Sequence, residues 1–407
     1  MLATFFSIAF AILLFFYPGA QDFVPHGGVM AVTMIVTATL FILLVAIAHM
    51  FAWSPLQRVE QNLTPRLVRL FRDDIHIKHP TYWILLFSLV TYMLAIGVVF
   101  SGIIKPIYFL AGWLVILGIS IDSFHHLLRR INSYFDPMTA VEHLSDQAQQ
   151  HVRNDDNAAL CDSFESLAEI AVKAVERTLP SLCNEAVNQT QIAARYYLES
   201  SKSVSHTHHD QKPVGDEVSF TLFFLFQRLE LVHDKALEEG MEPICSNIIT
   251  ALGKIAIDAA KLDLSLVSYP IHFLGKFAHH AQVMGLPDVA EKATCTLTEV
   301  SRVIIEEVDL KYYDLKEPFF SIIYQLEEIA KETFRQDKQM QIDLLEQPFH
   351  DLKALFDHER VATHQDRDAV VADIDRVLGE FTELALVMKT LPPIPEVKEE
   401  EEPVPQQ

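Results

Sequence analysis

The sequence predicts an all-α protein in which an N-terminal region of four transmembrane helices precedes a cytoplasmic α-helical domain, solenoid-like or a bundle. Three observations lead to this fold class. Long apolar runs lie within the first 123 residues, apolar residues recur at helical spacing after them, and no alternating apolar stretch indicates a strand. Half of the residues are hydrophobic, which is too many for a disordered chain.

Charge divides the chain into two parts. Residues 1–123 contain six Lys or Arg and five Asp or Glu, and subtraction from the totals of 32 and 54 leaves 26 and 49 for residues 124–407. The second part is therefore strongly acidic. An acidic surface repels phosphate backbones, so we expect no nucleic-acid partner, and a basic protein is easier to accommodate.

Four apolar segments are candidate membrane spans, at about residues 2–17, 29–53, 81–100 and 106–121. The second contains no Asp, Glu, Lys or Arg and ends at Trp53, a residue type that suits the membrane interface. The first is short, and a cleaved signal peptide is its alternative. No Lys or Arg precedes it and a poor cleavage site follows it, so we predict a retained helix.

Basic residues near the spans are concentrated in the loop of residues 54–80. Because Lys and Arg are retained on the cytoplasmic side, we predict that both termini are cytoplasmic, and we prefer the bacterial inner membrane. From Thr64 onward, apolar and basic residues separate onto two helical faces, which fits either an interfacial helix or an ordinary loop. The residues expected at the membrane interface are Trp53, Arg58, Arg66, Arg69, Arg72 and Lys78.

Residues 124–390 are expected to form a soluble helical domain, and residues 391–407, with five prolines and a run of four glutamates, a disordered acidic tail. Pro180, Pro243, Pro270 and Pro287 suit first turns of helices, and Gly240 and Gly285 suit helix ends. The predicted helices cover about residues 137–152, 158–178, 181–200, 217–238, 242–262, 270–284, 287–308, 317–335, 339–358 and 366–389.

A short pattern recurs within these helices, at Leu167–Ala174, Leu252–Ala259 and Leu274–Ala281, with looser copies at 297–304 and 326–333. Successive starts differ by 85, 22, 23 and 29 residues. A spacing near 22 corresponds to one helix plus a turn, as in two-helix solenoid repeats. The small residue in the middle would let neighbouring helices approach closely. A closed antiparallel bundle is the alternative.

One cluster could bind a metal, although all of its ligands would come from a single short loop: His206, His208, His209 and Asp210. His233–Asp234 lacks the further ligands that a phosphohydrolase site needs. Cys161, Cys183, Cys245 and Cys295 show no CxxC spacing and are expected to be reduced, packed thiols. We therefore predict no enzyme, no cofactor and no metal site.

A phenylalanine-rich stretch gives the chain its candidate partner surface, at Phe220, Phe223, Phe224 and Phe226. A buried central helix is the first interpretation, and a docking surface is the second. The resulting hypothesis is a non-enzymatic membrane scaffold or adaptor that contacts lipids and binds a cytoplasmic protein, with a homo-oligomer left open. The alternatives are a subunit or regulator of a channel or transporter, and a metal-dependent enzyme that uses the histidine-rich loop.

Overall fold

The predicted all-α class is confirmed by a computed structural model, in whose described residues no strand occurs. The chain forms two compact units, Met1–Ala193 and Ala194–Gln407. The structure describes residues 2–16, 27–62, 71–72, 74–100, 106–205, 214–310, 313–337 and 341–390.

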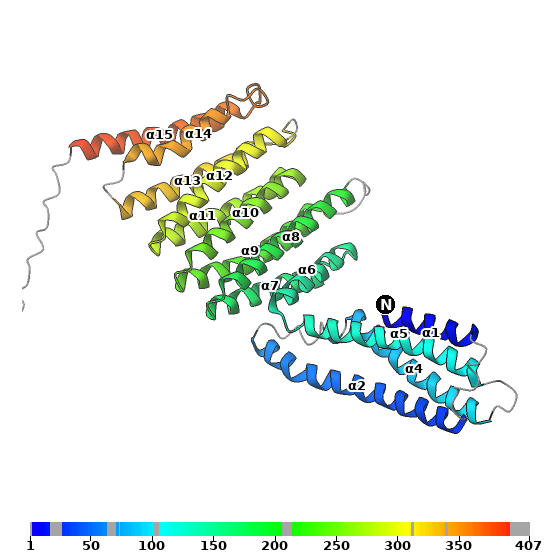
Figure 1. The fold of residues 1–407 in the computed structure, drawn as a ribbon. Helices are drawn as coiled ribbons and strands as arrows, with labels where there is room; N and C mark the ends of the chain where they lie inside the picture. The colour runs from blue at the N-terminus through cyan, green and yellow to red at the C-terminus, as the bar shows by residue number, and fades with distance from the viewer. Residues whose placement is uncertain are drawn as a thin grey trace, which may run out of the picture. The chain divides into compact units, whose positions relative to one another are not determined.

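The first unit begins with four apolar helices: α1 (Leu2–Phe16), α2 (Gly27–Asn62), α4 (Ile75–Phe100) and α5 (Pro106–Ser133). They lie side by side in the order α2, α4, α5, α1, and each packs on its neighbour (Figure 1). Three contain segments long and apolar enough to cross a membrane, whereas α1 is a shorter apolar helix. We call these four helices the apolar layer.

The helices of the apolar layer extend beyond the predicted spans. The second continues to Asn62, the third begins at Ile75, and α5 runs through the predicted domain boundary at residue 123 as far as Ser133. The physical reason is that hydropathy marks only the membrane-length part of a helix, while backbone hydrogen bonding continues into polar residues. Most of the predicted interfacial segment, residues 63–70 and 73, lies outside the described residues.

Helix α1 is held on α5 at its first turn. The Asp122 carboxylate accepts hydrogen bonds from the backbone N–H of Ala3 (3.2 Å) and Thr4 (3.0 Å) and from the Thr4 hydroxyl (2.6 Å). One turn earlier, Gly118 lies so close to Ser7 that a Cβ would collide with it. The acid therefore supplies acceptors to amides that have no partner within α1.

A polar cluster joins the start of α4 to the end of α5 and to α6 (Pro137–Arg153). Asp74 accepts from Arg130 Nε at 2.7 Å and from the Tyr134 hydroxyl at 2.8 Å, and Arg130 Nη1 lies 2.9 Å from His143 Nε2. Burial alone would raise the pKa of Asp74, but the hydrogen bonds from Arg130, the His76 amide and Tyr134 outweigh it and lower that pKa. Burial also raises the pKa of Tyr134 and lowers that of His143.

Helix α7 (Asn157–Glu176) follows α6 in the first unit, and α8 (Pro180–Ser205) begins in the first unit and ends in the second. The first turns of α6 and α7 are capped by Asp136, which accepts from Met138 N, and Asp156, which accepts from Ala159 N.

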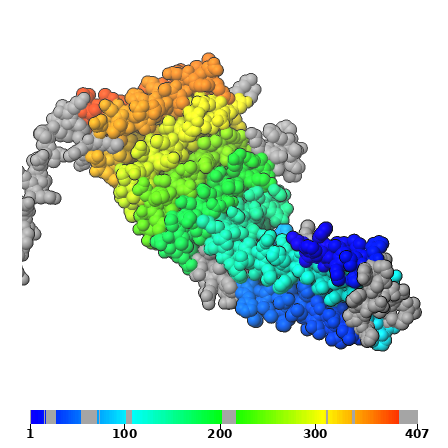
Figure 2. Space-filling view, viewed as in Figure 1, coloured from blue at the N-terminus to red at the C-terminus, as the bar shows by residue number. Residues whose placement is uncertain are grey.

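The second unit contains α9 (Val214–Glu238), α10 (Glu242–Leu262), the 3-10 helix η2 (Leu264–Val267), α11 (Ser268–Val283), α12 (Pro287–Glu307), α13 (Lys316–Gln336), α14 (Ile342–Leu355) and α15 (Arg367–Thr390). We call these helices the array. Helices adjacent in sequence pack together, and so do α10 with α12, α11 with α13, α12 with α14 and α13 with α15. The contacts therefore run along a stack of two layers, as in a solenoid (Figure 1), and side chains fill the gaps between its ribbons (Figure 2).

The small residues of the recurring pattern lie where helices meet. A Cβ on Gly253 would collide with Thr296 of α12, and one on Gly275 would collide with Gln325 of α13. Both glycines thus allow contact with the helix two positions further along the chain, and they stand at the second position of the pattern, not in its middle. Gly240 and Gly285, predicted as helix ends, follow α9 and α11 with φ of +66° and +79°, the left-handed conformation that favours glycine.

Candidate functional site: an apolar groove in the array

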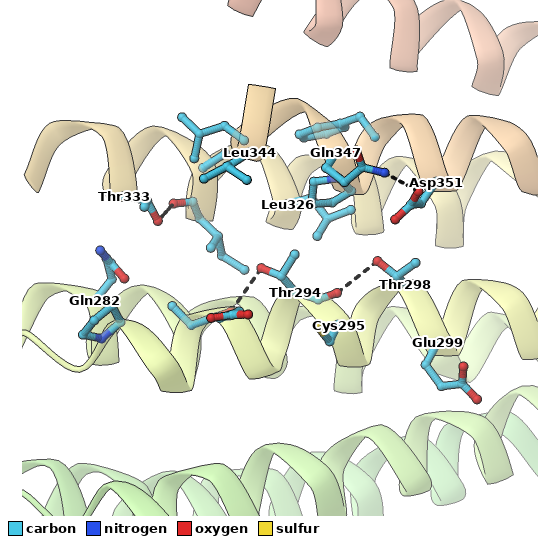
Figure 3. A pocket seen from close by; sticks show the side chains of 18 of the residues that line it. Gln282, Thr294, Cys295, Thr298, Glu299, Leu326, Thr333, Leu344, Gln347 and Asp351 are labelled. Carbon is cyan, nitrogen blue, oxygen red and sulfur yellow. Dashed lines mark hydrogen bonds between the residues drawn. The ribbon is translucent and has the colours of Figure 1, made fainter. Parts of the chain in front are cut away.

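A groove of about 730 Å³ lies between α12, α13 and α14, with the end of α11 closing it (Figure 3). Helix α12 contributes one wall, from Pro287 to Arg302. Its lining residues recur every three or four positions, so they form one face of the helix. At 1.5 Å per residue this face is about 22 Å long. The groove is therefore elongated along the helices.

Apolar side chains form the floor of the groove. Leu326 comes from α13, and Leu345 and Phe349 come from α14; all three are buried. On the same wall lies Pro348, inside α14, which has no N–H to donate to the carbonyl of Leu344. Apart from that carbonyl, the floor offers an occupant apolar contact rather than hydrogen bonds.

Threonines in the walls contribute little polarity, because their hydroxyls are bonded within their own helices. Thr294 donates to the Ala290 carbonyl at 3.1 Å, Thr298 donates to the Thr294 carbonyl at 3.1 Å, and Thr333 of α13 does the same with its own helix. Each of these hydroxyls has therefore already used its one donor.

The rim is acidic. Glu291 and Glu299 lie on α12 and Asp351 lies on α14, and all three are exposed. Arg302 binds Glu299 and Glu306 at 2.5 Å each, and its hydrogen bonds lower the pKa of Glu299. The cation of the rim is thus already neutralised by two carboxylates, which leaves net negative charge along the opening.

A buried amide closes the end of the groove at α11. Gln282 is 4% exposed, and its Nε2 donates to Gln336 Oε1 at 3.4 Å. Its Oε1 has no hydrogen-bond partner among the described residues. A buried acceptor without a donor carries an energetic cost.

One cysteine differs from the prediction that all four are packed. Cys183 and Cys245 are buried and burial raises the pKa of Cys245 to about 12, but Cys295 is exposed and lies on the groove face of α12. It directly follows Thr294 along α12. Cys295 is therefore an accessible thiol at the site.

The histidine-rich loop, with His206, His208, His209 and Asp210, lies outside the described residues. Among the residues that the structure does describe, no group of three His, Cys, Asp or Glu side chains could hold a metal ion.

His233 is a core residue of the array. It is fully buried and its ring stacks on Phe277 with centroids 4.3 Å apart. Burial lowers the pKa of His233, although Asp234 lies beside it, so the neutral imidazole is favoured.

The phenylalanines of α9 divide between core and surface. Phe226 is fully buried against Phe273, with ring centroids 5.4 Å apart, whereas Phe220 is 66% exposed and Phe223 41% exposed. Phe224 is half-buried beneath the guanidinium of Arg228. They do not line the groove, so the two candidate surfaces are separate.

Three of the predicted membrane-interface side chains are described. Trp53 on α2 and Arg72 are exposed, and Lys78 is half-buried in the first turn of α4. The side chain of Arg58, on α2, and the whole of Arg66 and Arg69 lie outside the described residues.

Sequence reasoning missed the groove, although two signals were present. A proline within a predicted helix, Pro348, indicates a wall with a local packing defect. Thr294 and Thr298, four residues apart on one face of α12, indicate a stripe of small side chains that leaves space beside the helix.

No protein-family model matches the chain, and no match was found among curated proteins. Among solved structures, the chain is similar to one described as a "circular tandem repeat protein with novel repeat topology and enhanced subunit contact surfaces". The two share 15% identity over 89% of this chain and 100% of the other, with a TM-score of 0.29.

Proposed function

We propose that this protein is a membrane-anchored, non-enzymatic scaffold whose array binds a cytoplasmic protein in the groove between α12, α13 and α14. The observation that carries the proposal is an apolar groove with an accessible opening in an otherwise acidic domain. Open apolar surfaces of this kind usually bind a partner.

Exposed apolar side chains on the apolar layer support the proposal of a membrane anchor. Leu40 on α2, Leu89 on α4 and Tyr108 on α5 are each about half or more exposed, and in water such a surface would be covered or would aggregate. A bilayer removes this cost because lipid chains solvate the side chains. The arginines of the loop at 54–80 favour the orientation that leaves the array in the cytoplasm.

In-cell photocrosslinking of the full chain tests the scaffold. A photoreactive amino acid replaces Leu344, at the groove and 58% exposed, or Tyr324, a surface position on α13 that is 57% exposed and outside the groove. We expect one defined protein adduct from position 344 and none from position 324. Adducts of equal yield at both positions, or none at position 344, would contradict the proposal.

A channel or transporter subunit is the second candidate function, favoured by one polar pair on the apolar layer. The Thr39 hydroxyl of α2 lies 2.9 Å from the Tyr92 hydroxyl of α4, and this hydrogen bond is exposed. Copies assembled around such groups would line a pore. Reconstituted protein that shows no ion flux, and no change on Tyr92→Phe, would exclude this function.

A further inference from the structure

We propose that the groove takes an amphipathic helix of the partner protein, about four turns long, with Lys or Arg beside its apolar face. The inference rests on the proposed scaffold function and adds the chemistry of the partner segment.

The backbone of the occupant must satisfy its own hydrogen bonds. The walls are helices whose amides are bonded internally, and the hydroxyls of Thr294, Thr298 and Thr333 are bonded to their own backbones. An extended peptide would therefore lose hydrogen bonds to water and gain almost none from the groove. A helix keeps all of its central bonds when it enters an apolar site.

The dimensions of the groove also match a helix. The groove face of α12, from Pro287 to Arg302, is about 22 Å long, which corresponds to about four turns of a second helix lying along it. Residues Leu326, Ile329, Ala330 and Thr333 repeat the spacing of three and four residues on α13. Ridges at that spacing pack into the grooves between the ridges of another helix.

Charge selects a basic partner. The rim carries Glu291, Glu299 and Asp351, and Arg302 is already paired with two carboxylates. Anionic amphiphiles such as fatty acids are disfavoured by the same rim.

The chain's own C-terminus is a poor occupant. Residues 391–407 contain a run of four glutamates, which the rim repels, and five prolines, which oppose a helix. The partner segment is therefore expected on another protein.

The experiment measures how a model peptide protects Cys295 from maleimide alkylation. The full chain carries Cys161→Ser, so that Cys295 is the exposed thiol to be alkylated, and is held in nanodiscs of zwitterionic lipid. The probe is a synthetic helix of about 16 residues with leucine on one face and lysine on the other. Its matched control keeps the leucines and replaces lysine by glutamate, and empty nanodiscs measure how much peptide binds lipid.

We expect the leucine–lysine peptide to slow alkylation about tenfold when its free concentration is about ten times Kd, and the leucine–glutamate peptide to leave the rate within about twofold. Reversing two rim charges together, Glu291→Lys with Asp351→Lys, should weaken the protection about fivefold or more. Glu359→Lys, an exposed acid outside the groove, should leave it unchanged.

Equal protection by both peptides, or by neither, would overturn the inference. So would faster alkylation after removal of residues 391–407, because it would identify the chain's own tail as the occupant, and so would a rate that falls with protein concentration, because it would identify a second copy. If position 344 yields a protein adduct in cells while the leucine–lysine peptide gives no protection, the scaffold stands and the basic helix is excluded. If the leucine–lysine peptide protects Cys295 while position 344 yields no protein adduct in cells, the groove binds a basic helix and the proposed cytoplasmic partner is excluded.

Discussion

Two regions of this protein contain long apolar helices and bury them differently. In the membrane-length segments of α2, α4 and α5, 33%, 33% and 22% of residues are buried, whereas in α10 the share is 61%. Helix α10 packs on α9, α11 and α12, so its apolar residues form the core of the array. Apolar composition alone therefore does not distinguish a membrane span from a core helix; the surroundings of the helix do.

Replacing an exposed leucine by arginine should have the most different effects in the two regions. Leu40 on α2 and Leu231 on α9 are 49% and 52% exposed. If α2 spans a bilayer as proposed, Leu40→Arg places a cation in the hydrocarbon core and should cost about 2.5–3.5 kcal/mol in membrane insertion. Leu231→Arg faces water and should change stability by about 0.5 kcal/mol or less. The amount of membrane-integrated protein is measured for both variants. Equal losses would show that the two leucines share one environment.

Close helix contact should make the array sensitive to one added methyl group. In Gly275→Ala, the new Cβ meets the buried side chain of Gln325, and we expect a loss of about 1–3 kcal/mol in thermal unfolding. Gly379 of α15 has no atom within 4 Å of its Cβ position, so Gly379→Ala should gain about 0.5–1 kcal/mol. Adding Gln325→Ala to Gly275→Ala should restore part of the loss; no rescue would mean that another contact is responsible.

In the apolar layer, the hydrogen bonds of Asp122 hold the first turn of α1 on α5. Asp122→Ala removes the acceptor of Ala3 N and Thr4 N and should destabilise the attachment of α1 by about 0.5–2 kcal/mol. Faster hydrogen exchange of the α1 amides measures this. Ser123→Ala removes a hydroxyl bonded within α5 and serves as the control, with α1 exchange expected to stay unchanged.

The smallest expected effect is a pH-dependent change in stability that comes from an ion pair of the array. Burial by itself would raise the pKa of Glu327, but hydrogen bonds from Arg376 and Lys331 outweigh it and hold that pKa below its ordinary value of 4.5. A carboxyl with a lowered folded pKa contributes stability above pH 4.5 and loses it as the pH falls through the folded pKa. Urea unfolding at pH 5 and pH 3 should therefore differ less in Glu327→Gln than in the natural protein. An unchanged difference would exclude this pair as a source of acid sensitivity.

The extent of the array was predictable from sequence because its boundaries are set by local chemistry. Pro243 and Pro287 lie in the first turns of α10 and α12, and Gly240 and Gly285 follow the ends of α9 and α11, so the helix bounds agree to within a few residues. The continuous α5 was missed because hydropathy changes at residue 123 while helix formation does not. The groove was missed because it depends on how far α12, α13 and α14 stand apart, which no single helix encodes.

The central claim is that the apolar layer lies in a bilayer while the array lies outside it, and the natural tryptophans test this directly. The chain contains three, Trp53, Trp83 and Trp113, and all lie in α2, α4 and α5. Brominated lipid chains quench indole fluorescence on contact. In vesicles of brominated lipid we predict strong quenching of tryptophan emission and none of a fluorophore attached to Cys295. Unquenched tryptophans, or equal quenching of both signals, would contradict the account.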